Sequence, residues 1–259
     1  MGYRRGKTPA RPGAVSFQFD RYVMKAALPT PPAIFGYQKL QRGHWEIFGN
    51  DDYCDCVWAG AAHETMLWKR MAHRKATFSR ISVLTDYAKA TGFNPYLPKT
   101  DNGTDMQRGA SWRRKTGIVD AKGKKHKILA YLALRPGDFD QLVLAIYLFG
   151  AVGIGLRLPD TADRQFDRKK PWSVVEGSRV TGGHYVPGFG RDKDGNIIVV
   201  SWGRSQRMTP QFYKRYSDEA IAYISVDALL HGKSRGGLRR KQLIADLKAL
   251  RRPRSPFPV

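Results

Sequence analysis

Apolar and polar positions follow different patterns on the two sides of Gly150 in this 259-residue chain. Before Gly150, apolar side chains recur at helical spacing, most clearly from Cys56 to about Met71. After it come the runs "AVGIGLRLP", "RVTGGHYVPGFG", "NIIVVSWG" and "AIAYISV", which are typical of strands. A helix-rich first half followed by a β-rich second half predicts an α+β protein of two packed lobes.

Capping and turn residues predict where several elements begin and end. Asp138 opens the capping-box spacing of a helix that Gly150 terminates. The segment "LPKTDNGTDMQRGASWRRKTGI" begins with turn residues and continues as a helix that Thr104 is expected to cap. Thr209, followed by proline, starts a short helix "PQFYKRYSDE". The loop "RDKDGN" predicts a hairpin between the second and third strands.

The longest apolar run, Leu142 to Leu156, has 15 residues and contains three glycines. It is shorter than the roughly 20 residues that span a bilayer, so it predicts a buried helix followed by a buried strand. The N-terminus lacks the apolar stretch of a secretory signal, and two cysteines do not form a disulfide framework. We therefore expect a soluble, cytoplasmic protein with no membrane partner.

The net charge of +23 is concentrated in three stretches. Residues 1–13 carry a net +4, residues 108–127 a net +7 and residues 232–259 a net +8. Basic segments on a nearly neutral globule usually contact polyanions, so nucleic acid is a candidate partner. A solvated basic surface with no such partner is the alternative.

Composition divides the chain into three parts. Residues 1–35, with several prolines, are expected to form an extended basic arm that lies across the globule. Residues 36–231 form the expected folded domain, with a helical lobe over about 36–150 and a β lobe over about 151–231. Residues 232–259 read as a basic helix or tail.

Cys54 and Cys56 are the only cysteines and admit four interpretations. With His63 and His184 they would make four zinc ligands, but the one-residue gap suits a tetrahedral site poorly. A disulfide between them would be strained, and inert burial is common for cysteine. The fourth interpretation is a nucleophile, because the start of a helix stabilises a thiolate.

The segment "NDDYCDCVWA" resembles the active-site segment of papain-like cysteine peptidases. In that family a glutamine that donates to the oxyanion lies six residues before the nucleophile, and here Asn50 lies six residues before Cys56. The family's histidine strand is matched by "GGHYVPGFGRDKDGNIIVVSWG", which contains His184 and ends in Ser201, Trp202 and a glycine.

The resemblance implies a papain-like two-lobe fold in which Cys56 attacks, His184 is its base and Asn50 holds the oxyanion. It is clearest over residues 49–66 and 181–203 and absent from the basic ends. The pattern is most similar to divergent papain-like proteins encoded by phages and prophages. Under this interpretation Cys54 is a bystander.

Several positions depart from the family pattern. Val200 stands where the family has an asparagine that orients the histidine. The His184 ring must then be oriented by Ser201, by a backbone carbonyl or by Asn196, or by no group at all. Asp55 would raise the pKa of the thiol if its carboxylate faced the sulfur. Trp202 is expected to shield the site from water or to be a core aromatic residue, and His63 to be packed or hydrogen-bonded and not catalytic.

Two functional hypotheses follow. The first is a thiol hydrolase, a cysteine peptidase or amidase, that acts on a peptide or protein substrate through Cys56 and His184 and needs no cofactor or metal. The second is a catalytically weak or inactive papain-fold protein that contacts nucleic acid or virion assembly partners through its basic arms. In the second case the protein is expected in the virion if it is phage-encoded.

Overall fold

The computed structural model of the protein describes residues 3–20 and 28–228. The predicted helix or tail at 232–259 lies outside these residues. The helices are α2 (Cys56–Met71), α3 (Arg80–Thr91), α4 (Met106–Lys115), α5 (Phe139–Phe149), α6 (Thr161–Asp167) and α7 (Pro210–Tyr216). Short 3-10 helices are η1 (Tyr37–Leu40), η2 (Pro98–Thr100) and η3 (Val226–Ala228).

The main sheet is antiparallel, with the strand order β4-β9-β5-β6-β7-β8 and with β1 paired to the end of β6. Its strands are β1 (Phe35–Gly36), β4 (Ala130–Leu134), β5 (Val152–Pro159), β6 (Val180–Arg191), β7 (Ile197–Ser201), β8 (Arg204–Met208) and β9 (Ser217–Ile224). A separate pair is formed by β2 (Ile118–Val119) and β3 (Lys125–His126).

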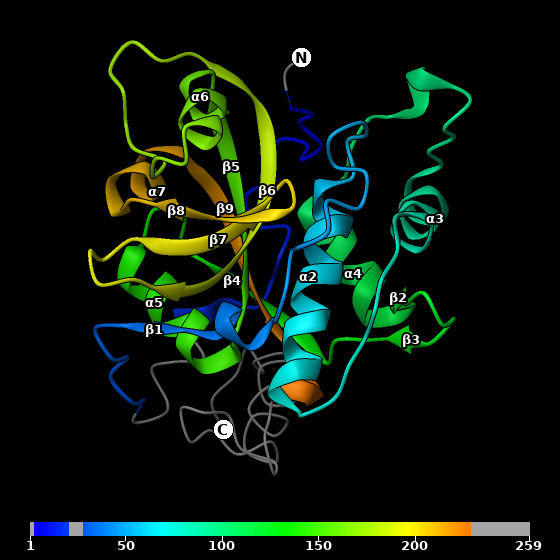
Figure 1. Ribbon diagram of the computed structural model, residues 1–259, viewed down its shortest axis with the longest axis horizontal. Coiled ribbons are helices and arrows are strands. Elements are labelled where there is room, and N and C mark those ends of the chain that lie inside the picture. The colour runs from blue at the N-terminus through cyan, green and yellow to red at the C-terminus, as the bar shows by residue number, and fades with distance from the viewer. Residues whose placement is uncertain (1–2, 21–27, 229–259) are drawn as a thin grey trace, which may run out of the picture.

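Two apolar cores lie on either side of the sheet. One core joins the sheet to α5, α6 and α7, and the other joins it to α2, α3 and α4. Helix α2 contacts β6 as well as α3 and α4, and Figure 1 shows it between the sheet and those two helices. The α+β, two-lobe architecture predicted from the residue pattern is confirmed. No helix in the described segments is long and apolar enough to cross a membrane.

Most of the predicted elements in the described segments form as expected. Helix α2 spans the predicted residues, Asp138 caps α5 through the Gln141 N–H, and Gly150 ends that helix in a left-handed conformation. The four predicted strands correspond to β5, β6, β7 and β9, and the hairpin joins β6 to β7. The apolar run therefore becomes a buried helix followed by a buried strand.

Two predicted details are wrong. Asp105, not Thr104, caps α4 by accepting from the Arg108 N–H, since the backbone of Thr104 pairs with the N-terminal segment instead. The helix that begins at Pro210 ends at Tyr216, because Ser217 already pairs in β9. The sequence pattern also gave no sign of α3, β4 or β8. Of these, β4 precedes residue 150, the predicted boundary between the helical and β lobes, yet it pairs with β9 in the main sheet.

A buried polar network joins α2 to the sheet. Glu64 of α2 accepts from the Tyr185 hydroxyl of β6 at 2.5 Å and pairs with Arg113 of α4 at 2.6 Å. The guanidinium lies over the ring of Tyr223, with its carbon 4.1 Å from the ring centroid. Gly60 leaves room for the Tyr185 ring, which lies 2.3 Å from where a Cβ would stand. Because each member is buried, removing one leaves a desolvated partner without compensation.

We predict that Glu64→Gln lowers the free energy of unfolding by about 3–5 kcal/mol, because Arg113 would remain charged and buried without its partner. Urea unfolding followed by tryptophan fluorescence measures the change. Asp52→Asn, which removes the exposed Asp52–Arg80 pair, is the matched control and should cost about 0–1 kcal/mol. Equal losses in the two variants would contradict the role of the buried network.

Candidate active site

Cys56 is the first residue of α2 and is 1% exposed. Backbone N–H groups of Tyr185 and Gly6 lie close enough to its sulfur to act as donors that oppose the rise of the thiol's pKa. Because Tyr185 directly follows His184 on β6, the sulfur lies beside the strand that carries the histidine. The two residues that the sequence assigns to the reaction therefore lie on elements that contact each other, Cys56 at the start of α2 and His184 on β6.

His184 is fully buried, and its ring is held from one side by Ser201. The Nε2 atom lies 2.8 Å from the Ser201 hydroxyl at the end of β7, whereas Nδ1 has no hydrogen-bond partner among the described residues. The Val200 side chain is buried in the core. Asn196 bonds to Asp192 within the β6–β7 hairpin, so it does not orient the histidine.

Cys54 has a different environment from Cys56. Its backbone N–H donates to the Asp101 carboxylate, and its side chain is only partly buried. Both cysteines are free thiols. The described part of the chain contains no cluster of three His, Cys, Asp or Glu side chains able to hold a metal, so the zinc interpretation lacks a ligand set here.

Asn50 is 4% exposed and lies in the loop that precedes α2. Its Nδ2 makes no hydrogen bond of normal geometry in the described segments, although the side chain lies close enough to Asp55 to oppose the rise of that residue's pKa. Burial raises the Asp55 pKa well above its usual value. Beyond the effect of burial, the Asp55 carboxyl in turn raises the pKa of the Cys56 thiol, as the sequence predicts for a carboxylate close to the sulfur.

His63 fixes the loop that carries Asn50. Its Nε2–H donates to the Glu46 carbonyl at 2.8 Å, and the rings of Trp45 and Phe48 pack against it. His63 is thus the packed, hydrogen-bonded residue that the sequence predicts. Burial lowers its pKa to about 4, although the bond to Glu46 opposes that shift.

Trp202 covers the histidine. Its ring stacks on His184 with 4.5 Å between the ring centroids. Trp202 and Gly203 form the two-residue turn from β7 to β8, both with positive φ, as such tight hairpins require. This conformation costs a tryptophan about 1–2 kcal/mol relative to glycine. The strain is offset by packing in a core that also contains Phe166 and Trp172.

Residues 3–8, which we call the N-terminal strap, run between Gly183 of β6 and Thr104 and pass beside Cys56. The Lys7 N–H donates to the Gly183 carbonyl at 3.0 Å on one side. On the other side, the Thr104 N–H donates to the Gly6 carbonyl and the Thr8 N–H donates to the Thr104 carbonyl. Gly183 must be small here, because a Cβ would lie 2.1 Å from the Lys7 carbonyl oxygen.

Side chains of the strap reinforce these backbone bonds. Tyr3 stacks on Trp202 with 4.2 Å between ring centroids, and its hydroxyl donates to Asp167 at 2.6 Å. Arg5 pairs with Asp163 at 2.5 Å. Beyond the strap, Arg11 forms two hydrogen bonds to the Asp105 carboxylate. These basic residues of segment 1–13 are therefore paired within the molecule.

With the strap in position, both members of the reacting pair are neutral. Burial raises the pKa of the Cys56 thiol to about 12, against the opposing effect of its two N–H donors. Burial, followed by the charge of Arg5, lowers the pKa of His184 well below its usual value. The sulfur is thus a thiol and the imidazole is uncharged in this arrangement.

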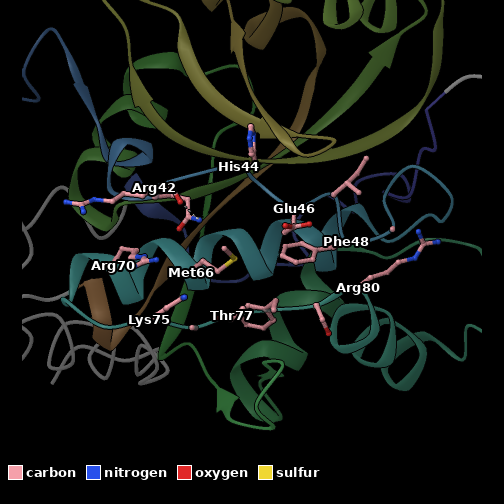
Figure 2. A pocket seen from close by; sticks show the side chains of 15 residues that line it. Arg42, His44, Glu46, Phe48, Met66, Arg70, Lys75, Thr77 and Arg80 are labelled. Atoms are coloured by element: carbon pink, nitrogen blue, oxygen red, sulfur yellow. Dashed lines mark hydrogen bonds between the residues drawn. The ribbon is translucent and has the colours of Figure 1, made fainter.

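A pocket of about 560 Å³ lies away from Cys56 and His184, between the loop around His44 and the segment that follows α2. Met66 and Arg70 of α2 form part of its wall (Figure 2). None of the four predicted site residues lines it. The reacting pair is covered by the strap and not exposed in an open pocket.

The catalytic roles of Cys56, His184, Asn50 and Ser201 stay predictions, and the sequence did not reveal which segment covers this part of the molecule. Residues 1–35 were expected to lie across the globule, without a stated place. The spacing "GYRRGKT", a glycine between basic residues, was the available signal, because only a small residue fits where Gly6 crosses the Cys54 carbonyl. The aromatic stack of Tyr3 on Trp202 had no signal in the sequence.

No family profile and no curated protein sequence matches the chain, whereas several solved structures do. Xylellain, a cysteine protease from Xylella fastidiosa, is similar with a TM-score of 0.65 and 15% identity over 86% of this chain and 97% of that one. A Carica candamarcensis cysteine protease in complex with E-64 has a TM-score of 0.56 and 13% identity, over 75% of this chain and 99% of that one. A ragweed pollen cysteine protease in its proform has a TM-score of 0.57 and 15% identity, over 82% of this chain and 71% of that one.

Identities this low show the fold alone, and that fold is papain-like. The predicted α+β papain-like class is therefore confirmed. The neighbours give no support to the predicted phage origin, to a virion location or to nucleic-acid binding.

We predict that His63→Gln flattens the loss of stability on acidification. An unfolded chain protonates His63 near pH 6.5, but the folded chain does so only near pH 4, so stability falls as the pH drops through this window. The slope from this group is at most about 1.4 kcal/mol per pH unit. Urea unfolding at several pH values between 4.5 and 6.5 measures it, with the exposed His44→Gln as control. Equal slopes for His63→Gln and the unmutated protein would contradict the assignment.

Proposed function

We propose that the protein is a papain-like cysteine peptidase in which Cys56 is the nucleophile and His184 is its proton-transfer partner. Ser201 orients the imidazole, and Asn50 with the Cys56 backbone N–H stabilises the oxyanion. The observation that carries the proposal is the buried His184, whose Nδ1 has no partner in the described segments, on the strand whose Tyr185 N–H lies near the Cys56 sulfur. The papain-like neighbours support a peptide or protein as substrate.

The chemistry proceeds in two halves. In the first, the Cys56 thiolate attacks the substrate carbonyl, and protonated His184 donates its proton to the departing amine, leaving a thioester on the sulfur. In the second, neutral His184 takes a proton from water, which attacks the thioester and releases the acid and the thiol. Atoms and charge balance without any cofactor.

The strap holds the enzyme in a closed form under this proposal. Hydrogen bonding directs the Gly6 carbonyl to Thr104, and it is the Gly6 N–H that lies close to the Cys56 sulfur. The strap thus offers the nucleophile a donor and not an electrophile, so it covers the site without being cut. Displacing it would return water to the pair and allow the thiol and imidazole to ionise.

The competing hypothesis is a papain-fold binding protein without catalysis. Val200 in place of the family's asparagine favours it, but the Ser201 contact to His184 supplies an alternative orienting group. Pairing of Arg5, Lys7 and Arg11 within the molecule leaves fewer N-terminal charges for a polyanion. Residues 108–127 keep several exposed lysines, and their contact with nucleic acid is still a prediction.

We predict that loosening the strap activates Cys56. In a Cys54→Ser background, the double change Tyr3→Ala and Arg5→Ala should raise the rate of alkylation by iodoacetamide at pH 7.5 about tenfold for each unit by which the thiol pKa falls. Mass spectrometry of the labelled peptide measures the rate. Arg4→Ala, in the same segment but exposed, is the matched control.

Adding His184→Ala to the loosened protein should abolish the increase, because the ion pair is lost. The same loosened variant is expected to cleave a fluorescent casein substrate, and Cys56→Ser to eliminate that cleavage. The same double change can also be made in a protein that keeps Cys54. If Cys54 and Cys56 then react with iodoacetamide equally slowly, the hydrolase hypothesis is ruled out and the binding hypothesis is favoured.

We predict that Ser201→Ala in the loosened protein lowers kcat about tenfold with little change in KM, since the imidazole keeps its place but loses its orientation. The acid limb of the pH–rate profile should also move, because the hydroxyl no longer contacts Nε2. Ser205→Ala, an exposed serine on β8, serves as control. An unchanged kcat and profile would remove Ser201 from the mechanism.

A further inference from the structure

The side chain of Lys7 occupies a closed polar pocket beside the reacting pair, which we call the Lys7 socket and define by Met106, Gly155, Asp218 and Glu219. The Lys7 side chain is fully buried, and its Nζ lies 3.0 Å from both carboxylates. The ammonium also donates to the Thr8 carbonyl at 2.9 Å. One buried cation thus meets two acidic side chains.

The socket depends on two features of the sheet. A Cβ at Gly155 of β5 would lie 2.2 Å from the Lys7 Cε and 2.8 Å from the Met106 sulfur, so only glycine leaves the space. The pairing of β9 with β5 shifts register beside Asp218, between the pairs Gly155–Glu219 and Leu156–Ser217. Consecutive residues of a regular strand face opposite sides, so this irregularity is what lets both acids reach one ammonium.

The socket lies one residue from the chemistry. The backbone N–H of Lys7 bonds to the carbonyl of Gly183, the residue before His184, and the preceding Gly6 lies over the Cys56 sulfur. In the β5–β6 ladder, Leu156 pairs with His184, and the neighbouring Gly155 is the floor of the socket. A chain that followed the path of the strap would present a side chain to this socket.

We infer that the Lys7 socket is a specificity pocket that selects substrates carrying a basic residue next to the residue held over Cys56. The inference rests on the proposed function and adds the substrate class to it. A lysine of the substrate replaces Lys7 when the strap leaves. A neutral residue there would leave the two largely buried carboxylates without a cation, which is unfavourable.

The first experiment measures cation binding and needs no activity. Lys7→Ala in the full chain empties the socket, so n-butylammonium should give a saturable rise in its thermal midpoint. The neutral isostere n-butanol should not give it, and neither should n-butylammonium with the unmutated protein, whose socket is occupied. Lys7→Met fills the socket without charge, so it should not respond, and the combination Lys7→Ala with Glu219→Gln should respond much less.

The second experiment measures selectivity. With Lys7→Ala protein, two peptides that differ only by lysine or norleucine at one position are compared by kcat/KM, with lysine expected to be favoured about tenfold or more. Glu219→Gln should lower that ratio about tenfold. Asp194→Asn, an exposed acid in the β6–β7 hairpin, is the matched control and should keep the ratio.

The outcomes separate the inference from the function on which it rests. No selective rise with n-butylammonium overturns the socket, whatever peptides are cut. A selective rise with cleavage indifferent to lysine overturns the substrate class and leaves the peptidase intact. A selective rise without any cleavage overturns the proposed peptidase and the substrate role with it, while the cation pocket is demonstrated.

Discussion

The hydrogen bond from Tyr185 to Glu64 sets the geometry on which the rest of the site depends. Tyr185 follows His184 on β6, and Glu64 lies two turns after Cys56 on α2. Together with the Glu64–Arg113 ion pair, this hydrogen bond fixes the position of α2 along β6, because each buried polar group requires the others as partners. Cys56 and His184, from distant parts of the chain, are thereby carried on two elements whose contact is fixed by residues with no part in the proposed chemistry.

Cys56 and His184 could be proposed from the sequence because each marks the end or interior of an element with strong local signals. Cys56 opens a long apolar helix, and His184 lies in a strand followed by a clear hairpin turn. Ser201 was one of three alternatives, and only its position at the end of β7, where the pleat turns its side chain toward His184, decides among them. Asn50 was identified by its spacing alone, and its buried amide fits that prediction without testing it.

What the sequence could not reveal depends on contacts between distant residues. In the sequence, Lys7 is one of several charges in a basic arm. In the structure it pairs with Asp218, 211 residues later, which an irregularity in β9 brings next to it. The cap of α4 falls on Asp105 because Thr104 is used by the strap, another long-range effect. Charge counting treats each ion as solvated and therefore cannot distinguish a free arm from one that is paired along its length.

The same pairing has an electrostatic consequence. Where the strap lies, its cations neutralise Asp163, Asp218 and Glu219, and Arg11 neutralises Asp105. Withdrawal of the N-terminus would uncover a row of negative charge on a molecule whose overall field is strongly positive. Such a row attracts cationic chains and repels nucleic acid, so any polyanion held by the basic surface would be kept away from the sulfur while a basic peptide is drawn to it.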